Sequence, residues 1–198
     1  GTLALSGGNN RLPTGNDLVY GATSTLDVGS TSQTIRNLVF NSTATGTSTI
    51  TGSGGALVSN PTTNLVIGGN SSGATRTVTM AGLSTFTFNG VGRAFSVGGV
   101  HDASGASPSG GTLLLAQTSN ITAASFNVGT GSNGFSYQNT GTVQLGQTTV
   151  LNANTIIVGG EKNVATLNYQ AGLTNPVLTI RGTSGGSTSA NITVSTNS

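Results

Sequence analysis

Residues 112–130 read TLLLAQTSNITAASFNVGT, and residues 142–160 read TVQLGQTTVLNANTIIVGG, so the second stretch repeats the first at an offset of 30. The matching positions are mainly apolar or lie at the ends of expected strands, as in Ile121 with Leu151 and Phe126 with Ile156. In stacked coils of β-strands, equivalent residues lie about 4.8 Å apart and form continuous interior columns. The alignment therefore predicts a coil of β-strands in which residues 112–130 lie against residues 142–160.

A glycine that ends an expected strand recurs with nearly the same step. It is found at Gly68, Gly98, Gly129 and Gly159, so the steps are 30, 31 and 30 residues. A fixed period of this length is typical of repeat architectures, in which each unit buries its apolar face by stacking on its neighbour. We expect these glycines to supply positive φ at corners, because no helix follows them as a phosphate-binding loop would require.

The composition favours an ordered β-protein over a disordered chain. Of 198 residues only 5% are charged, compared with about 25% in ordinary soluble domains, and 32 are glycine. Disordered segments usually combine low hydrophobicity with high net charge, whereas this chain is 34% hydrophobic with a net charge of +2. Branched Thr, Val and Ile residues recur in regular bursts, as expected for a pleated sheet.

Short strands are expected throughout the chain, with essentially no helix. The expected strands are residues 2–5, 17–20, 25–28, 34–40, 48–51, 56–58, 64–67, 75–80, 85–88, 94–97, 112–116, 125–128, 134–137, 142–145, 155–158, 165–169, 177–180 and 191–194. Each unit of about 30 residues would hold about three strands. The alternative is a two-sheet antiparallel sandwich, which explains the density of strands but not the 30-residue step.

We therefore expect a single all-β domain over residues 1–198, a right-handed parallel β-helix with about 30 residues per coil. The hand follows from the strong preference of parallel crossovers. Residues 65–198 should form regular coils and residues 1–64 irregular ones, because the similar segments 18–21, 38–41 and 65–68 recur with steps of 20 and 27. The loop Gly99–Gly111 has no strand pattern and should protrude.

A second motif, Gly-Thr-Leu/Val-x-Leu, occurs at Gly1–Leu5, Gly111–Leu115 and Gly141–Leu145. Followed by polar turns, this motif resembles the autotransporter-associated β-strand repeats of bacterial surface proteins. The resemblance implies a right-handed parallel β-helix, secretion to the bacterial cell surface and the role of a passenger or stalk. The chain departs from the family in having no C-terminal membrane barrel, so we expect the export and anchoring parts to lie outside it.

No catalytic, cofactor or metal site is expected. The four acids are Asp17, Asp27, Asp102 and Glu161. Glycoside hydrolysis needs two carboxylates roughly 5 to 10 Å apart. Asp17 and Asp27 could face each other on adjacent strands, but solvated turn residues are the simpler interpretation. Four scattered acids also cannot supply the six or more oxygens of a typical Ca²⁺ site without heavy use of carbonyl groups, so a carbohydrate-active β-helix is not favoured.

Two binding features remain open. His101 and Asp102 form a titratable pair and a possible loop contact, although a pair without a role is the simpler interpretation. Tyr137 and Tyr169 lie 32 residues apart and could form an aromatic ladder that binds glycans if they do not stack inward. The six basic residues are scattered, which argues against nucleic-acid binding. The sequence contains no run of about 18 apolar residues, the length that a membrane-spanning helix needs.

The sequence therefore predicts a non-catalytic, extracellular or cell-surface structural protein, a subunit of a fibre or surface layer. The first and last segments, Gly1–Leu5 and Asn191–Val194, both read as strands with open edges. We expect either a piece of a longer array of coils or a subunit whose partner is a second copy stacked head to tail. The alternative is an adhesin passenger or stalk segment that binds surface glycans through loops such as Gly99–Gly111.

Overall fold

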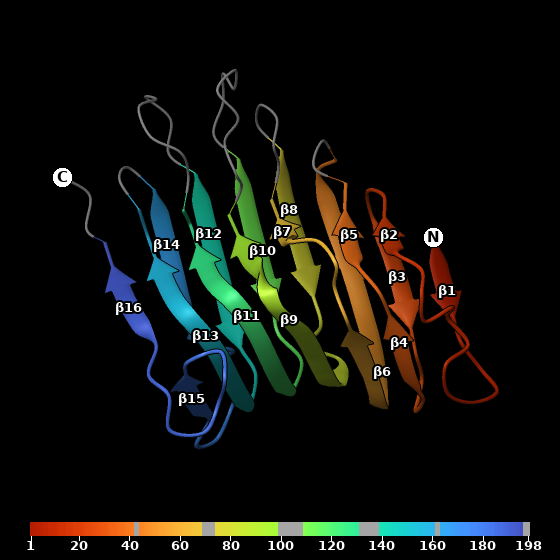
Figure 1. Ribbon diagram of the computed structural model, residues 1–198. Coiled ribbons are helices and arrows are strands. Elements are labelled where there is room, and N and C mark those ends of the chain that lie inside the picture. The colour runs from red at the N-terminus through yellow and green to blue at the C-terminus, as the bar shows by residue number, and fades with distance from the viewer. Residues whose placement is uncertain (42–43, 69–73, 99–108, 131–138, 161–162, 196–198) are drawn as a thin grey trace.

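The computed structural model describes residues 1–41, 44–68, 74–98, 109–130, 139–160 and 163–195. His101, Asp102, Tyr137, Glu161 and most of the loop Gly99–Gly111 therefore lie outside the described residues. In the described part the chain is all-β with no helix, and its strands form a curled, half-barrel sheet (Figure 1). No segment of this part is a helix long and apolar enough to cross a lipid bilayer.

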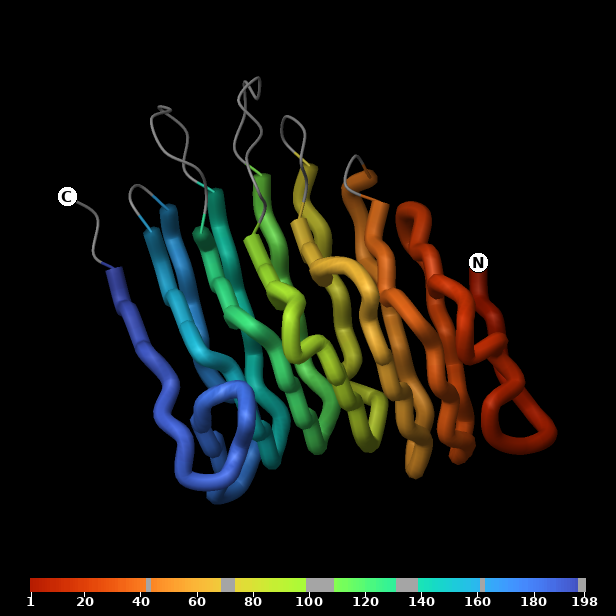
Figure 2. Tube along the Cα trace, viewed as in Figure 1, coloured from red at the N-terminus to blue at the C-terminus, as the bar shows by residue number. Residues whose placement is uncertain are grey.

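The described residues contain sixteen strands, fourteen of them in one sheet, while β2 and β5 form a sheet of two. Their bounds are β1 Thr2–Ala4, β2 Leu18–Tyr20, β3 Ser24–Asp27, β4 Ser32–Ile35, β5 Leu38–Phe40, β6 Gly46–Ser59, β7 Leu65–Ile67, β8 Thr75–Thr79, β9 Leu83–Val97, β10 Gly110–Leu114, β11 Thr118–Val128, β12 Thr140–Leu145, β13 Thr148–Val158, β14 Val164–Tyr169, β15 Val177–Arg181 and β16 Asn191–Val194. Strands β1 and β16 lie at opposite ends of the sheet (Figure 2).

Every pairing between the described strands is parallel, which excludes the antiparallel sandwich. The pairing of β11 with β13 confirms the alignment made from the sequence: Ile121 lies opposite Leu151 and Phe126 opposite Ile156. The offset between partners is 30 residues there. The offset is 20 between β2 and β5, 24 between β3 and β6, and 35 between β8 and β10, as Leu18↔Leu38, Ser24↔Ser48 and Thr75↔Gly110 show.

The core lies on the inner side of the curled sheet, where alternate residues of each strand point. Phe88, Phe95 and Phe126 are at most 1% exposed. The Phe95 and Phe126 rings stack with centroids 5.2 Å apart, and Phe88 meets Phe95 edge to face at 5.1 Å. One outward row pairs threonines across five successive strands: Thr47, Thr77, Thr112, Thr142 and Thr166.

The recurring glycines take the corner conformation expected from the sequence. Their φ angles are 137° at Gly68, 106° at Gly98, 62° at Gly129 and 84° at Gly159, all in the region that side chains disfavour. The last three also extend the hydrogen-bond ladders between successive turns of the chain, which we call passes. The Gly98, Gly129 and Gly159 amides each donate to a carbonyl oxygen of the preceding pass at a distance of 2.8 Å. Each strand therefore turns at a fixed place without losing backbone hydrogen bonds.

Candidate functional site

The two acids considered for hydrolysis do not lie on paired strands. Asp17 precedes β2, which pairs with β5, whereas Asp27 ends β3, which pairs with β1 and β6. The Asp17 Oδ1 accepts hydrogen bonds from Arg36 Nε and Asn37 Nδ2, each 2.8 Å long, and the bond from Arg36 is the main cause that lowers the pKa of the Asp17 carboxyl. The carboxylate of Asp27 accepts from the Gly29 amide at 2.8 Å. Asp27 therefore bonds within its own turn, whereas Asp17 links the segment before β2 to the segment before β5.

The other predicted site residues fall largely outside the described part of the chain. His101, Asp102 and Tyr137 are in this position, so the loop contact and the aromatic ladder stay predictions. Tyr169 ends β14, opposite Leu145, and is 36% exposed. No cluster of three or more metal-ligating side chains is found among the described residues.

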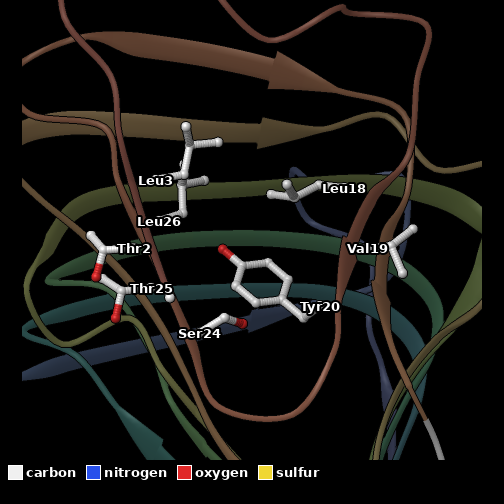
Figure 3. A pocket seen from close by; sticks show the side chains of 9 residues that line it. Thr2, Leu3, Leu18, Val19, Tyr20, Ser24, Thr25 and Leu26 are labelled. Atoms are coloured by element: carbon white, nitrogen blue, oxygen red, sulfur yellow. The ribbon is translucent and has the colours of Figure 1, made fainter.

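A hollow opens at the N-terminal end of the sheet, with a volume of about 360 Å³. Strands β1, β2 and β3 and the residue before β1 supply its walls, which are formed by Gly1, Thr2, Leu3, Leu18, Val19, Tyr20, Ser24, Thr25 and Leu26. Figure 3 shows Leu18 and Tyr20 pointing toward Leu3 and Leu26, while Val19 points away. The hollow is the open end of the core, because no described strand lies beyond β1 and β2 to cover these side chains.

Two hydroxyl groups of the hollow lack a partner. Tyr20 Oη and Ser24 Oγ are both buried and make no hydrogen bond within the described part of the chain. The Tyr20 ring packs on Phe40 with centroids 5.3 Å apart, and its burial raises the pKa of the phenol well above the usual value. A buried hydroxyl group without a hydrogen-bond partner reduces the free energy of unfolding by roughly 1–3 kcal/mol. These two groups therefore make the N-terminal end of the core less stable than it would be with partners.

The backbone around the hollow is also unpaired on one side. Among the described strands, β1 pairs with β3 alone and β2 with β5 alone. The third edge at this end, β4, is covered: the Asn10 amide donates to Ser32 O at 2.9 Å, and the Arg11 and Leu12 amides donate to Gln33 Oε1 at 2.7 and 3.0 Å. The expectation of a fully open end is therefore corrected, because two of the three edges are open and residues 9–12 cap the other.

The opposite end of the sheet exposes side chains that face the interior. Tyr169 of β14 and Ile192 and Val194 of β16 are 36%, 55% and 72% exposed. The partners of Tyr169 and Ile192 one strand back are Leu145 and Ile156, each 1% exposed, and Val158, the partner of Val194, is partly buried and packs against the core. The same holds at the N-terminal end, where Leu3 is 51% exposed and its partner Leu26 is 2% exposed. Apolar side chains of the core are thus uncovered at both ends.

One buried polar group lies away from both ends. Arg76 of β8 is 2% exposed and has no acidic partner among the described residues; its Nη2 donates to Ser48 Oγ at 2.7 Å and its Nη1 to Ala44 O at 3.4 Å, while Nε has no partner in the same part of the chain. The guanidinium lies over the Phe40 ring, 5.7 Å from the centroid. Burial lowers the pKa of this group.

Sequence reasoning missed the hollow, Tyr20 and Arg76. Only the two backbone edges and the apolar lining suggest what the hollow could bind, since its side chains include no carboxylate, imidazole or thiol. No family model matches the chain, and no curated protein or solved structure is similar enough to it to count as a match. The arrangement is suited to receiving extended strands with apolar side chains.

Proposed function

We propose that this chain is a non-catalytic structural module, a segment of right-handed parallel β-helix with coils of about 30 residues. In this proposal it belongs to a fibre, surface layer or stalk at a bacterial cell surface and lengthens by end-to-end contact with a second copy. The Gly-Thr-Leu motif, which resembles that of the autotransporter-associated repeats, and the 30-residue offset of β10 and β11 from β12 and β13 support it.

The observation that carries the proposal is the exposure of core side chains at both ends of the sheet. Leu3, Ile192 and Val194 are more than half exposed. Each lies opposite an apolar residue of the next strand that faces the core, namely Leu26, Ile156 and Val158. Burying apolar surface stabilises by about 25 cal/mol per Å². Natural edge strands are usually protected by Lys, Pro or a charge, whereas β1, β2 and β16 read TLA, LVY and NITV. Both ends therefore favour contact with further strands.

Sedimentation velocity and negative-stain microscopy over a concentration series test this role. We expect assemblies that lengthen with concentration at constant width. Val194→Lys places a charge on the C-terminal strand edge, which the proposed assembly buries. The assemblies of this variant should therefore no longer lengthen with concentration. The matched control is Val91→Lys, since Val91 is 63% exposed but lies in β9, in the middle of the strand order.

Short rods of one size at every concentration, for the parent chain and both variants, would refute the self-assembling role. The adhesin or stalk alternative would then take its place, with surface glycans as ligands of loops such as Gly99–Gly111. His101, Asp102 and Tyr137, which would carry that alternative, lie outside the described residues, so no observation favours it at present.

A further inference from the structure

The registers inside the sheet define columns that can be extended past its ends. In the first half of each pass, the inward Ser24 column and the outward Thr25 column run through six strands. The Ser24 column is Ser24, Ser48, Val78, Leu113, Val143 and Leu167, and the Thr25 column is Thr25, Thr49, Thr79, Leu114, Gln144 and Asn168. At the N-terminal end, Thr2 already extends the Thr25 column, because it pairs with Thr25.

A second pair of columns runs through the last part of each pass. The inward one is Leu65, Phe95, Phe126, Ile156 and Ile192, and the outward one is Val66, Ser96, Asn127, Ile157 and Thr193. At the N-terminal end, β5 lies beside β7 and pairs with β2, with Leu18 opposite Leu38 and Val19 opposite Val39. Strands β2 and β16 therefore stand at the two ends of the same series.

We propose that the N-terminal hollow receives the C-terminal edge of a second copy, so that its β14 pairs with β1 and its β16 with β2, both in parallel. This inference rests on the proposed function and adds the register of the joint. Continuing the columns places Asn168 opposite Thr2 and Tyr169 opposite Leu3. Strands β5 and β7 lie side by side, and Leu38 and Leu65 are both buried, so we take Leu38 as the next member of the Leu65 column. On that basis Ile192 lies opposite Leu18 and Thr193 opposite Val19.

The joint brings apolar side chains and backbone partners to the hollow. Leu167 comes opposite Gly1, which has no side chain, so a leucine enters the space beside Ser24. Val194, which is 72% exposed, comes opposite Tyr20. The open edges of β1 and β2 gain hydrogen-bond partners along their length, which neither a small molecule nor a lipid could provide.

A second copy is the occupant whose edge strands match the uncharged edges of the hollow. The strands that would meet read TLA and LVY on one side and VATLNY and NITV on the other, with no charged side chain in any of them. Joining them therefore buries no side-chain charge, which would carry a large desolvation cost. The third strand of the incoming edge, β15, meets the cap at residues 9–12, so the joint is made by two strand pairs. The exposed Arg181 of β15 and Arg11 of the cap lie outside these two pairs.

Disulfide trapping tests this register, because the chain has no cysteine of its own. One sample mixes Thr2→Cys chains with Asn168→Cys chains that carry a tag of different mass, and a second mixes Val19→Cys with Thr193→Cys. Directly opposed residues on paired strands are close enough for a disulfide, whose Cα atoms lie about 4.4–6.8 Å apart. The matched control mixes Thr2→Cys with Thr193→Cys, which the joint places on different strand pairs.

We expect a mixed disulfide dimer to form in the first two samples and not in the control. A Thr2–Thr2 or Asn168–Asn168 dimer as the main product would overturn the joint, since it would mean that like ends meet. If sedimentation shows assembly while neither expected pair is trapped, the register is wrong and the proposed function survives. If sedimentation shows no assembly, both fail. All four positions are exposed on strands that end the sheet, and circular dichroism checks that each variant keeps its β structure.

Discussion

Tyr20 differs from Phe40, its neighbour across the β2–β5 pair, by one hydroxyl group that finds no partner among the described residues. The Tyr20→Phe substitution removes this buried hydroxyl and leaves the ring stack in place. We expect the free energy of unfolding at pH 7 to stay the same or rise, by up to roughly 1–3 kcal/mol. Urea unfolding of both proteins measures the difference, and a clear loss of stability would mean that the hydroxyl has a partner in solution.

The same substitution makes a prediction about alkaline pH. Burial raises the pKa of Tyr20 above its usual value of about 10, so above that pH the unfolded chain releases a proton that the folded chain keeps. The contribution of Tyr20 to stability is therefore complete below pH 10 and falls as the pH rises further. Thermal melting between pH 8 and 11.5 should show a steeper fall for the parent chain than for Tyr20→Phe. Parallel curves would contradict the burial of this phenol.

Arg76 is a buried cation whose flanking positions in the ladder are Gly46 and Gly111. The missing side chains on both sides explain how a long side chain fits inside the sheet. Replacing buried ionic groups by apolar ones of similar size is often neutral or stabilising. We therefore expect Arg76→Met to melt at the same temperature as the parent chain or above it.

The control for Arg76 is the Lys variant. Arg76→Lys keeps the charge but loses the planar fork that reaches both Ser48 Oγ and Ala44 O, so it should melt below the parent chain. If the Met variant proved less stable than the Lys variant, the positive charge itself would be required at this position.

Among the elements, the glycines at the start of β10 and β12 set how closely successive passes approach. A Cβ atom added to Gly111 would collide with the carbonyl oxygen of Ile67 and lie 2.5 Å from the Gly98 nitrogen, both of them backbone atoms. Gly111→Ala should therefore destabilise by about 1–3 kcal/mol or more. Gly92→Ala is the matched control, because a Cβ atom there would have no neighbour within 4 Å and the φ of Gly92 is not positive. Equal urea midpoints for the two variants would contradict this close approach.

The sequence predicted the elements well where apolar residues alternate, and less well where polar residues face the core. Residues 125–128 and 155–158 were expected as strands, but β11 and β13 begin earlier, at Thr118 and Thr148. The inward positions there include Ser119 and Thr149, both fully buried, so the usual alternation is hidden. Ser119 satisfies its hydroxyl by donating to Ala116 O at 3.3 Å, a contact that periodicity does not reveal.

Glycines caused the other differences between expected and observed strands. Residues 48–51 and 56–58 were expected as separate strands because Gly52, Gly54 and Gly55 lie between them, yet β6 runs through from Gly46 to Ser59. The ladder with β9 shifts register there, which is how a strand accommodates extra residues. The hollow could not be predicted either, because residues such as Tyr20 and Leu3 read as ordinary core positions. Only the arrangement in space shows that no described strand pairs with the outer edges of β1 and β2.

At the scale of the whole molecule, local stability should fall from the middle of the sheet to its ends. Strands β9, β11 and β13 are long and paired on both sides, whereas β1, β2 and β16 have three or four residues and one partner each among the described strands. Backbone hydrogen bonds near the ends can open with little loss of buried surface. At low concentration, native-state hydrogen exchange should be fastest in β1, β2 and β16 and slowest in β11. Uniform exchange throughout the sheet would instead mean that it opens as a single cooperative unit.

Raising the protein concentration then separates an assembling end from one that merely frays. If the ends pair, the exchange of β1, β2, β14 and β16 should slow as concentration rises, because the newly formed hydrogen bonds protect their amides. The amides of residues 91–93, exposed in the middle of the molecule, should exchange at an unchanged rate. Val194→Lys should remove the concentration dependence and leave the protection of β11 intact. Slowing that is equal at the ends and at residues 91–93 would contradict a specific joint, since it would show that association covers the surface at random.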